Sequence, residues 1–420
     1  MVQSLRAKLE ELGKNSKIAS RELYRLGTTE KNRVLKSIQE SIERNKKRIV
    51  DANAIDMKNG RDVGLAEGLL DRLYLDDKRV DGMIASIDDV IELKDPIGVI
   101  DNMKTLENGL MLGKKSVPIG VIAIIYEARP NVTLDAAILG LKSSNVIVLR
   151  GGKEAINSNK AIADSIREGI KAAGYDENMV TLIENTSRES SMELMKLKGY
   201  IDLLIPRGSA SLINAVVENA NVPTLETGVG NCHVYVDKSA NIEMAINIIK
   251  NAKTTRIGVC NAMESLLVHK DVPTEFFERL KEIIEQYNIE VYGCERSMKV
   301  LDDIKLATEE DYKKEFLDYA TSMKIVDDID EAIDHIYVYS SGHSDVIVTE
   351  DYNNSMKFLN EVDSACVYVN ASSRFTDGGE FGKGAEMGIS TQKLHARGPV
   401  GLEELTSTKY IILGSGQIRE

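Results

Sequence analysis

Short runs of aliphatic and β-branched residues alternate with longer amphipathic segments over most of this chain. The first series of runs lies at 117–126, 144–150, 178–183, 200–206 and 222–227. The second lies at 233–237, 264–269, 289–293, 345–349 and 365–370. Strands joined through helices run parallel, and helices cover both faces of their sheet. The pattern therefore predicts an α/β fold with two doubly wound parallel sheets.

The two series meet at a glycine-rich stretch, "TGVGN" at 227–231. A chain of 420 residues exceeds the roughly 250 to 300 residues at which a single core stops growing. We therefore expect a domain boundary near 227–232. The first hundred residues have the apolar spacing of amphipathic helices, and the Asn108-Gly109 turn signal predicts a β-hairpin near 108–117.

Charge and composition exclude several classes of protein. The net charge of −13 argues against nucleic acid or an anionic membrane surface as a partner, because such partners need a basic face. The longest apolar run, 117–126, is too short to span a bilayer, and the charged N-terminus lacks the apolar centre of a secretory signal. We expect a cytoplasmic protein. The four cysteines show neither disulfide nor zinc-site spacing, which predicts free thiols and no metal.

Two junctions between a strand and a helix have the composition of phosphate sites, although no G-x-G-x-x-G follows a strand of the first sheet. Glycines admit an anion to backbone N–H groups, and a helix N-terminus and flanking cations attract it. An ordinary glycine turn beside a surface cation is the alternative. The residues concerned are Arg150, Gly151, Gly152 and Lys153 in "VLRGGKEA", and Arg207, Gly208 and Ser209 in "IPRGSASL".

Cys260, in "TTRIGVCNAMESLLVH", is the candidate nucleophile. Arg256 precedes it, and Asn261 follows at what the pattern indicates as a helix N-terminus. Cations and amide dipoles stabilise a thiolate. A small buried hydrophobe is the alternative role for a free cysteine.

Six ordered motifs carry a resemblance to a known family over nearly the whole chain. The chain resembles the γ-glutamyl phosphate reductases, also called glutamate-5-semialdehyde dehydrogenases, in the aldehyde dehydrogenase superfamily. The motifs are "GVIAIIYEARPNVTLDAA" (120–137), "IPRGSASLI" (205–213), "ETGVGNCHVYVD" (226–237), "RIGVCNAMESLLVH" (256–269), 326–348 and 369–412.

The resemblance implies three parts with different roles. Residues 1–107 and 118–228, with part of 365–394, are expected to form a cofactor-binding domain. Residues 229–364 are expected to form the catalytic domain, and 108–117 with 395–420 an oligomerisation arm. A homo-oligomer is therefore expected.

The resemblance also implies the reaction. It is the NADPH-dependent reduction of L-glutamate 5-phosphate to L-glutamate 5-semialdehyde and phosphate, the second step of proline biosynthesis. Cys260 matches the superfamily nucleophile and would form a thioester. A transient contact with glutamate 5-kinase is a further expectation, because the acyl phosphate is labile.

Glu226 falls 34 positions before Cys260, close to the interval that separates the general base from the nucleophile in aldehyde dehydrogenases. That base activates water, a reaction that a reductase should suppress, so a structural carboxylate is an equal alternative. The chain differs from the aldehyde dehydrogenase motif at Ala128, which stands where those enzymes have an asparagine that donates to the oxyanion. The Cys260 N–H and a second donor, for which Asn131 is a candidate, would take over.

The resemblance assigns ligand-binding residues as well. Arg150, with Lys153, would pair with the 2′-phosphate of NADPH, while Gly208 and Ser209 match the pyrophosphate-binding pair. Glu315 resembles the glutamate that holds the nicotinamide ribose. The candidates for an anionic substrate are Arg129, Arg256, His343 and Arg374.

Two other functions stay open. A hydrolytic or CoA-dependent aldehyde dehydrogenase would act on free aldehydes without phosphate. A non-catalytic acidic scaffold with this fold would not bind NADPH.

Overall fold

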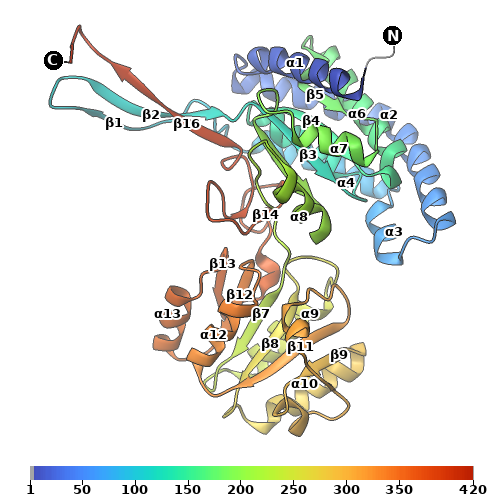
Figure 1. Cartoon of the computed structure of the whole chain (residues 1–420), viewed down its shortest axis with the longest axis vertical. Helices are drawn as coiled ribbons and strands as arrows, with labels where there is room; N and C mark the ends of the chain where they lie inside the picture. The colour runs from blue at the N-terminus through green and yellow to red at the C-terminus, as the bar shows by residue number, and fades with distance from the viewer. Residues whose placement is uncertain (1–3, 420) are drawn as a thin grey trace. The chain divides into compact units, whose positions relative to one another are not determined.

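The computed structural model describes residues 4–419, and contacts within the chain divide it into two units (Figure 1). The first unit comprises Met1–Glu226, Gly382–Gly388 and Val400–Glu420. The second comprises Thr227–Phe381 and Ile389–Pro399. The first crossing from unit to unit therefore lies at the glycine-rich stretch. The chain then returns twice to the first unit, after 381 and after 399, which the strand pattern does not indicate.

A parallel sheet of four strands forms the centre of the first unit. Its order is β5-β4-β3-β6, with β3 at Val121–Tyr126, β4 at Val146–Gly151, β5 at Val180–Leu182 and β6 at Leu203–Arg207. Every residue of β3 and β4 is buried, so helices must cover both faces of this sheet. The helices are α1 (Leu5–Leu23), α2 (Thr28–Asp62), α3 (Glu67–Leu73), α4 (Asp77–Glu92), α5 (Val132–Lys142), η1 (Lys153–Ala155), α6 (Ile156–Ala172), η2 (Glu177–Met179), α7 (Arg188–Met195) and α8 (Ala210–Asn219).

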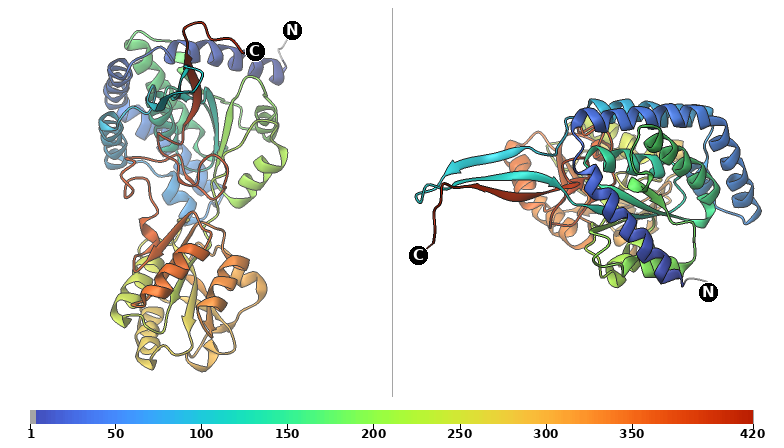
Figure 2. Two further views of the ribbon diagram at one scale, coloured as in Figure 1. Left: turned by 90° about the vertical axis from the view of Figure 1, so that its left-hand side faces the viewer. Right: turned by 90° about the horizontal axis from the view of Figure 1, so that it is seen from above.

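Three antiparallel strands extend from the first unit as an arm (Figures 1 and 2). They are β1 (Ile100–Thr105), β2 (Met111–Pro118) and β16 (Thr406–Leu413), in the order β1-β2-β16. The hairpin therefore begins earlier than the predicted 108–117. The residues of β1 are all exposed, and β16 pairs with β2 along its whole length.

The second unit contains a parallel sheet of seven strands in the order β10-β9-β11-β8-β7-β12-β13. The strands are β7 (Cys232–Val236), β8 (Met263–His269), β9 (Glu290–Gly293), β10 (Lys305–Leu306), β11 (Ala320–Val326), β12 (Ser344–Val348) and β13 (Cys366–Val369). Helices α9 (Ile242–Thr254) and α10 (Thr274–Tyr287) pack in one hydrophobic cluster, while α12 (Ile329–Tyr339) and α13 (Tyr352–Glu361) pack in another. The two clusters lie on opposite faces of a doubly wound sheet. The short elements are η3 (Ser297–Lys299), α11 (Glu309–Lys313), η4 (Ser373–Phe375), and β14 (Ile389–Ser390) paired with β15 (Gly398–Pro399).

Two expectations about strands need correction. The run 117–126 divides into β2 and β3 at Gly120, whose φ of +132° breaks the strand. A Cβ at Gly120 would lie 2.2 Å from Asp202 Oδ2, and that carboxylate accepts the Val121 N–H at 2.8 Å. The run 222–227 forms two isolated bridges in place of a strand, from Thr224 to Leu204 and from Thr227 to Ser390.

Among the longer elements of the second unit, the sequence pattern does not predict β11 and α13. Among the helices that residues 4–419 form, none combines the length and the hydropathy needed to cross a bilayer.

Candidate active site

Cys260 lies in a turn between α9 and β8. The turn is closed by the Ala262 N–H, which donates to the Val259 carbonyl at 3.1 Å. Cys260 is half-buried, and Asn261 follows in the same turn. The expected helix N-terminus at Asn261 is therefore wrong, because the segment after Cys260 enters β8 directly.

The backbone of Gly230 and the side chain of Cys232 pack against the carbonyl of Cys260. A Cβ on Gly230 would lie 1.6 Å from Cys260 O, so only glycine fits there. Cys232 donates its S–H to the same oxygen at 3.1 Å. Burial raises the pKa of Cys232 well above its usual value, which keeps it a thiol and a donor. The glycine-rich stretch therefore supports the loop that contains Cys260, in addition to linking two domains.

Asn261 connects the loop that contains Cys260 to the segment 372–376. Its amide donates to the carbonyls of Arg374 at 3.3 Å and Thr376 at 2.9 Å. The Ser373 hydroxyl donates back to the Asn261 carbonyl at 2.7 Å. These three hydrogen bonds fix the start of the Arg374 side chain relative to Cys260.

Arg374 and Arg256 bring positive charge to this loop. Burial lowers the pKa of Arg374, and so does the neighbouring charge of Arg256, while Cys260 and Asp377 act in the opposite direction. Arg256 is exposed in the loop itself. Positive charge beside a cysteine stabilises its thiolate form.

His343 and Glu315 have other contacts than those expected. His343 is fully buried, with Nδ1 at 2.8 Å from Ser344 Oγ and 3.6 Å from Cys232 Sγ. This position favours a supporting role behind the cysteines over the expected contact with substrate. Glu315 accepts the Gly230 N–H at 2.8 Å, so one of its oxygens holds the backbone beside Cys260.

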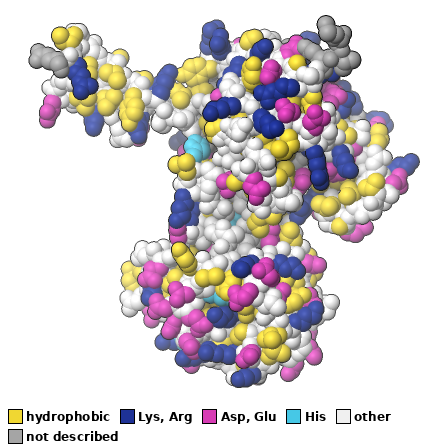
Figure 3. Space-filling model, in the orientation of Figure 1, with side chains coloured by type: hydrophobic (Ala, Val, Ile, Leu, Met, Phe, Trp, Pro, Cys, Tyr) yellow, Lys and Arg dark blue, Asp and Glu magenta, His cyan; other side chains and the backbone are white. Residues whose placement is uncertain are grey.

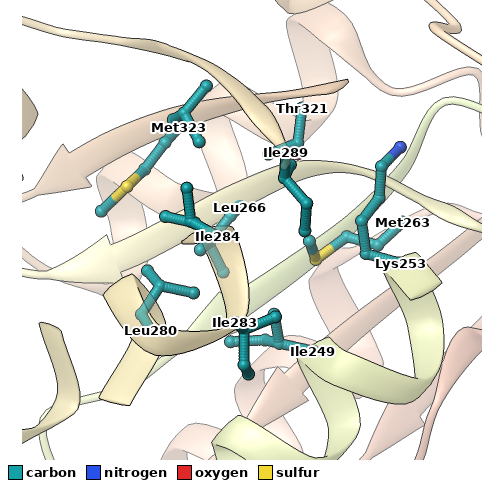
Figure 4. Close-up of a pocket in the computed structure, with 11 residues that line it drawn as sticks. Ile249, Lys253, Met263, Leu266, Leu280, Ile283, Ile284, Ile289, Thr321 and Met323 are labelled. Carbon is teal, nitrogen blue, oxygen red and sulfur yellow. The ribbon is translucent and has the colours of Figure 1, made fainter. Parts of the chain in front are cut away.

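A buried ion pair joins the two elements on either side of the Cys260 loop, α9 and β8. Lys253, at the end of α9, donates to Glu264 Oε2 at 2.8 Å, and both side chains are inaccessible to solvent. Figure 4 shows Lys253 at the edge of an apolar cavity between α9, α10 and the sheet. Glu264 Oε1 accepts the Leu317 N–H at 3.1 Å. Desolvation lowers the pKa of Lys253 and raises the pKa of Glu264.

The remaining predicted catalytic residues belong to the first unit. Asn131 precedes α5 and donates its amide to Asp135 Oδ2 at 2.9 Å. Burial raises the pKa of Asp135 to about 6, against the opposing effects of the Asn131 amide and the Arg207 charge. Arg129 and Glu226 are half-buried, and Glu226 is the last residue before the crossing into the second unit.

At the junction after β4, Arg150 is buried instead of facing a ligand. Its guanidinium donates to the carbonyls of Thr186 at 2.6 Å and Ser187 at 3.0 Å. This arrangement favours a structural role for Arg150 and leaves Lys153, which is exposed, as the cation for a phosphate. Gly151 and Gly152 are buried, and a Cβ on Gly152 would lie 2.0 Å from Glu154 Oε1.

At the junction after β6, a carboxylate sits at the start of α8. The Ser209 N–H donates to Glu127 Oε2 at 2.9 Å, and a Cβ on Gly208 would lie 2.5 Å from the same oxygen. Gly208 and Ser209 are exposed. The Glu127 carboxylate thus lies at the N-terminus of α8, where backbone N–H groups and the helix dipole stabilise an anion, and the same donors fit a phosphate group.

Comparisons with known proteins identify the family. The family model for the aldehyde dehydrogenase family matches residues 3–293. The γ-glutamyl phosphate reductase of Clostridium novyi is 56% identical over 96% of this chain and 97% of the relative. That of Halothermothrix orenii is 53% identical over 96% of each chain.

Solved structures agree with these sequence comparisons. The γ-glutamyl phosphate reductase of Thermotoga maritima is 50% identical, covers 98% of this chain and 100% of its own, and superimposes with a TM-score of 0.95. An acetylating aldehyde dehydrogenase of Geobacillus thermoglucosidasius shares the fold at 18% identity, with a TM-score of 0.72. The chain belongs to the aldehyde dehydrogenase family and, within it, to the γ-glutamyl phosphate reductases.

Proposed function

We propose that the chain reduces L-glutamate 5-phosphate to L-glutamate 5-semialdehyde and phosphate with NADPH, the second step of proline biosynthesis. The observation that carries this proposal is the half-buried thiol of Cys260, in a turn that packs against Gly230 and that Asn261 ties to the backbone of Arg374. The names of relatives more than 50% identical support the choice of substrate.

In this proposal Cys260 does the covalent chemistry. Its thiolate attacks the acyl carbonyl, the C–O bond to phosphate breaks, and the acyl group stays on the sulfur as a thioester. The nicotinamide supplies the hydride when it is bound. The C–S bond then breaks, the aldehyde leaves, and Cys260 returns as a thiolate. Covalent capture keeps the acyl group in place between the two steps.

The oxyanion of the acyl intermediates needs hydrogen-bond donors. We assign them to the Cys260 N–H and the Asn131 amide, whose second N–H remains after the bond to Asp135. For Glu226 both roles that the sequence analysis considered, a structural carboxylate and a general base, remain proposals.

NADPH is proposed as the cofactor, bound through the first unit. Ser209 and Gly208 would hold its pyrophosphate at the start of α8, and Lys153 would pair with its 2′-phosphate. Glu315, which accepts the Gly230 N–H, would hold the nicotinamide ribose. The supporting observation is the anion-binding geometry at Ser209.

Replacing Glu127 with glutamine is expected to tighten NADPH binding about three- to tenfold. Glutamine keeps an oxygen for the Ser209 N–H but removes the negative charge that competes with the pyrophosphate. Titration of protein fluorescence or calorimetry with NADPH measures the affinity. Glu168→Gln is the control, because Glu168 forms an exposed ion pair with Arg48 elsewhere in the same unit. Equal or weaker binding by the Glu127 variant would contradict the assignment.

A phosphate requirement separates this function from a hydrolytic or CoA-dependent aldehyde dehydrogenase. The reverse assay supplies glutamate semialdehyde and NADP⁺ with inorganic phosphate, with CoA, or with neither. We expect sustained formation of NADPH with phosphate alone. Equal rates without phosphate, or a dependence on CoA, would favour the alternative enzymes, and failure to bind NADPH would favour a scaffold.

A homo-oligomer assembled through the arm is proposed as well. The arm exposes apolar side chains, which appear as yellow atoms on it in Figure 3. Exposed apolar patches mark interaction surfaces. The residues are Ile100, Met103, Met111, Tyr410, Ile412 and Leu413. A monomeric mass by light scattering would remove this proposal.

A cytoplasmic location is proposed on the four free thiols, which fit a reducing compartment. The transient contact with glutamate 5-kinase also stays a proposal.

A further inference from the structure

The guanidinium of Arg374 carries hydrogen-bond donors without a partner in the protein. Its Nε and Nη1 atoms are both shielded from solvent, and no acceptor lies within hydrogen-bonding reach of either among the described residues. Buried donors almost always have partners, because an unpaired one is costly. The Nε–H shares one edge of the planar guanidinium with an Nη2–H, and such an edge matches the two oxygens of a carboxylate or a phosphate. Nη1 lies on the opposite side, next to Cδ.

The position of Arg374 relative to Cys260 is fixed by the backbone. Asn261, next to the nucleophile, donates to the Arg374 carbonyl, and the Ser372 hydroxyl accepts the Arg374 N–H at 3.3 Å. Arg374 itself lies in the single turn η4. The side chain therefore starts from a segment that is tied to the loop that contains Cys260.

The positive charge of Arg374 is not neutralised by an ion pair within residues 4–419. Neither Arg374 nor Arg256 forms an ion pair within residues 4–419, although the chain has a net charge of −13. Asp377 is the nearest acidic contributor, but its carboxylate accepts the backbone N–H groups of Gly379 at 2.8 Å and Glu380 at 3.4 Å. Arg374 and Arg256 repel each other because both are positively charged, and an anion bound beside them stabilises both charges.

We propose that Arg374 is the substrate-recognition residue of this enzyme, donating to an oxyanion of the substrate through the guanidinium edge that carries the unpaired Nε–H, while Arg256 supplies further positive charge. The oxyanion is either the phosphate that leaves the acyl carbon or the α-carboxylate of the glutamyl chain, since both present two acceptors to such an edge. This inference rests on the proposed function, because that function supplies a substrate with both groups.

The test uses Arg374→Gln in the reverse assay, with the KM for phosphate and the KM for glutamate semialdehyde measured separately. A phosphate site predicts a rise of about 10- to 100-fold in the KM for phosphate, with the semialdehyde little changed. A carboxylate site predicts the converse. Arg374→Lys keeps the charge but loses the planar pair of donors, so it is expected to recover only part of the loss.

A second readout does not depend on turnover. Inorganic phosphate or L-glutamate is added while iodoacetamide alkylates Cys260, and the rate of alkylation is followed by mass spectrometry of the peptide. The anion that binds at Arg374 is expected to slow alkylation in the parent enzyme and to lose that effect in Arg374→Gln. Arg296→Gln is the matched control, because Arg296 forms an exposed ion pair with Asp327 in the same unit.

The outcomes separate the inference from the proposed function. A parent enzyme without phosphate-dependent formation of NADPH contradicts the proposed function, and the alkylation experiment then still tests anion binding. An active parent whose folded Arg374→Gln variant keeps both KM values, with alkylation slowed as before, overturns the inference. Thermal melting of the variant establishes that it is folded.

Discussion

Replacing Cys260 with serine is expected to lower turnover by about 10³-fold or more while NADPH binding is retained. A serine hydroxyl fits the same turn but does not ionise near neutral pH, so the acyl group has no nucleophile to receive it. The Cys260 side chain is only half-buried, so serine loses only part of its packing contacts. Oxidation of NADPH under single-turnover conditions measures the chemical step directly.

Cys294 offers the matched control for this variant. Its thiol is also free and half-buried, in the same unit, and lies 3.2 Å from Ser297 Oγ. Cys294→Ser is expected to keep turnover within about twofold, because nothing in the account gives this sulfur a chemical role. A Cys260→Ser enzyme with more than a tenth of the parent's turnover would refute the assignment.

Replacing Lys253 with methionine is expected to lower the free energy of unfolding by about 3 to 5 kcal/mol. The change leaves the carboxylate of Glu264 buried with only the Leu317 N–H as a partner. Chemical denaturation followed by circular dichroism measures the loss. Lys281→Met is the control, because its partner Asp302 is exposed and such surface pairs contribute about 1 kcal/mol or less.

The loss should depend on pH in a definite direction. Desolvation already raises the pKa of Glu264 above its unfolded value, and removal of Lys253 removes a charge that opposes this rise. A raised folded pKa gives stability that is present at low pH and lost as pH rises through it. The Lys253→Met protein should therefore be closer to the parent at pH 5 than at pH 8. The double variant with Glu264→Gln should recover most of the deficit at pH 8, and a single variant as stable as the parent there would contradict the account.

The sheets of both units were predictable because their strands consist of apolar residues that helices cover on both faces. Strand β11 was not, since its sequence "ATSMKIV" includes buried Thr321 and Ser322. Thr321 and Ser322 hydroxyls donate to the Glu264 carbonyl, so polar residues there are compatible with burial. Local periodicity does not reveal a hydrogen bond to a strand distant in sequence.

The individual residues of the site were less predictable than the fold. Cys260 was identified from its neighbours and from the family resemblance. Asn261 was wrongly predicted to begin a helix, because its contacts with 372–376 join segments more than a hundred residues apart and local sequence does not reveal them. The position of Arg150 in the sequence is that of a phosphate ligand, yet its Nη2 donates to the carbonyls of Thr186 and Ser187. The support that Gly230 and Cys232 give to the Cys260 carbonyl likewise depends on the packing of distant segments.

The acyl-enzyme on Cys260 is the central claim, and peptide mass spectrometry tests it most directly. The enzyme is mixed with glutamate semialdehyde and NADP⁺ in the absence of phosphate, and the reaction is stopped in acid. The account predicts a glutamyl adduct on the peptide that contains Cys260, formed together with a stoichiometric burst of NADPH and released when phosphate is added before the acid. Sustained turnover with Cys260 unmodified, or after its thiol has been alkylated, would contradict it.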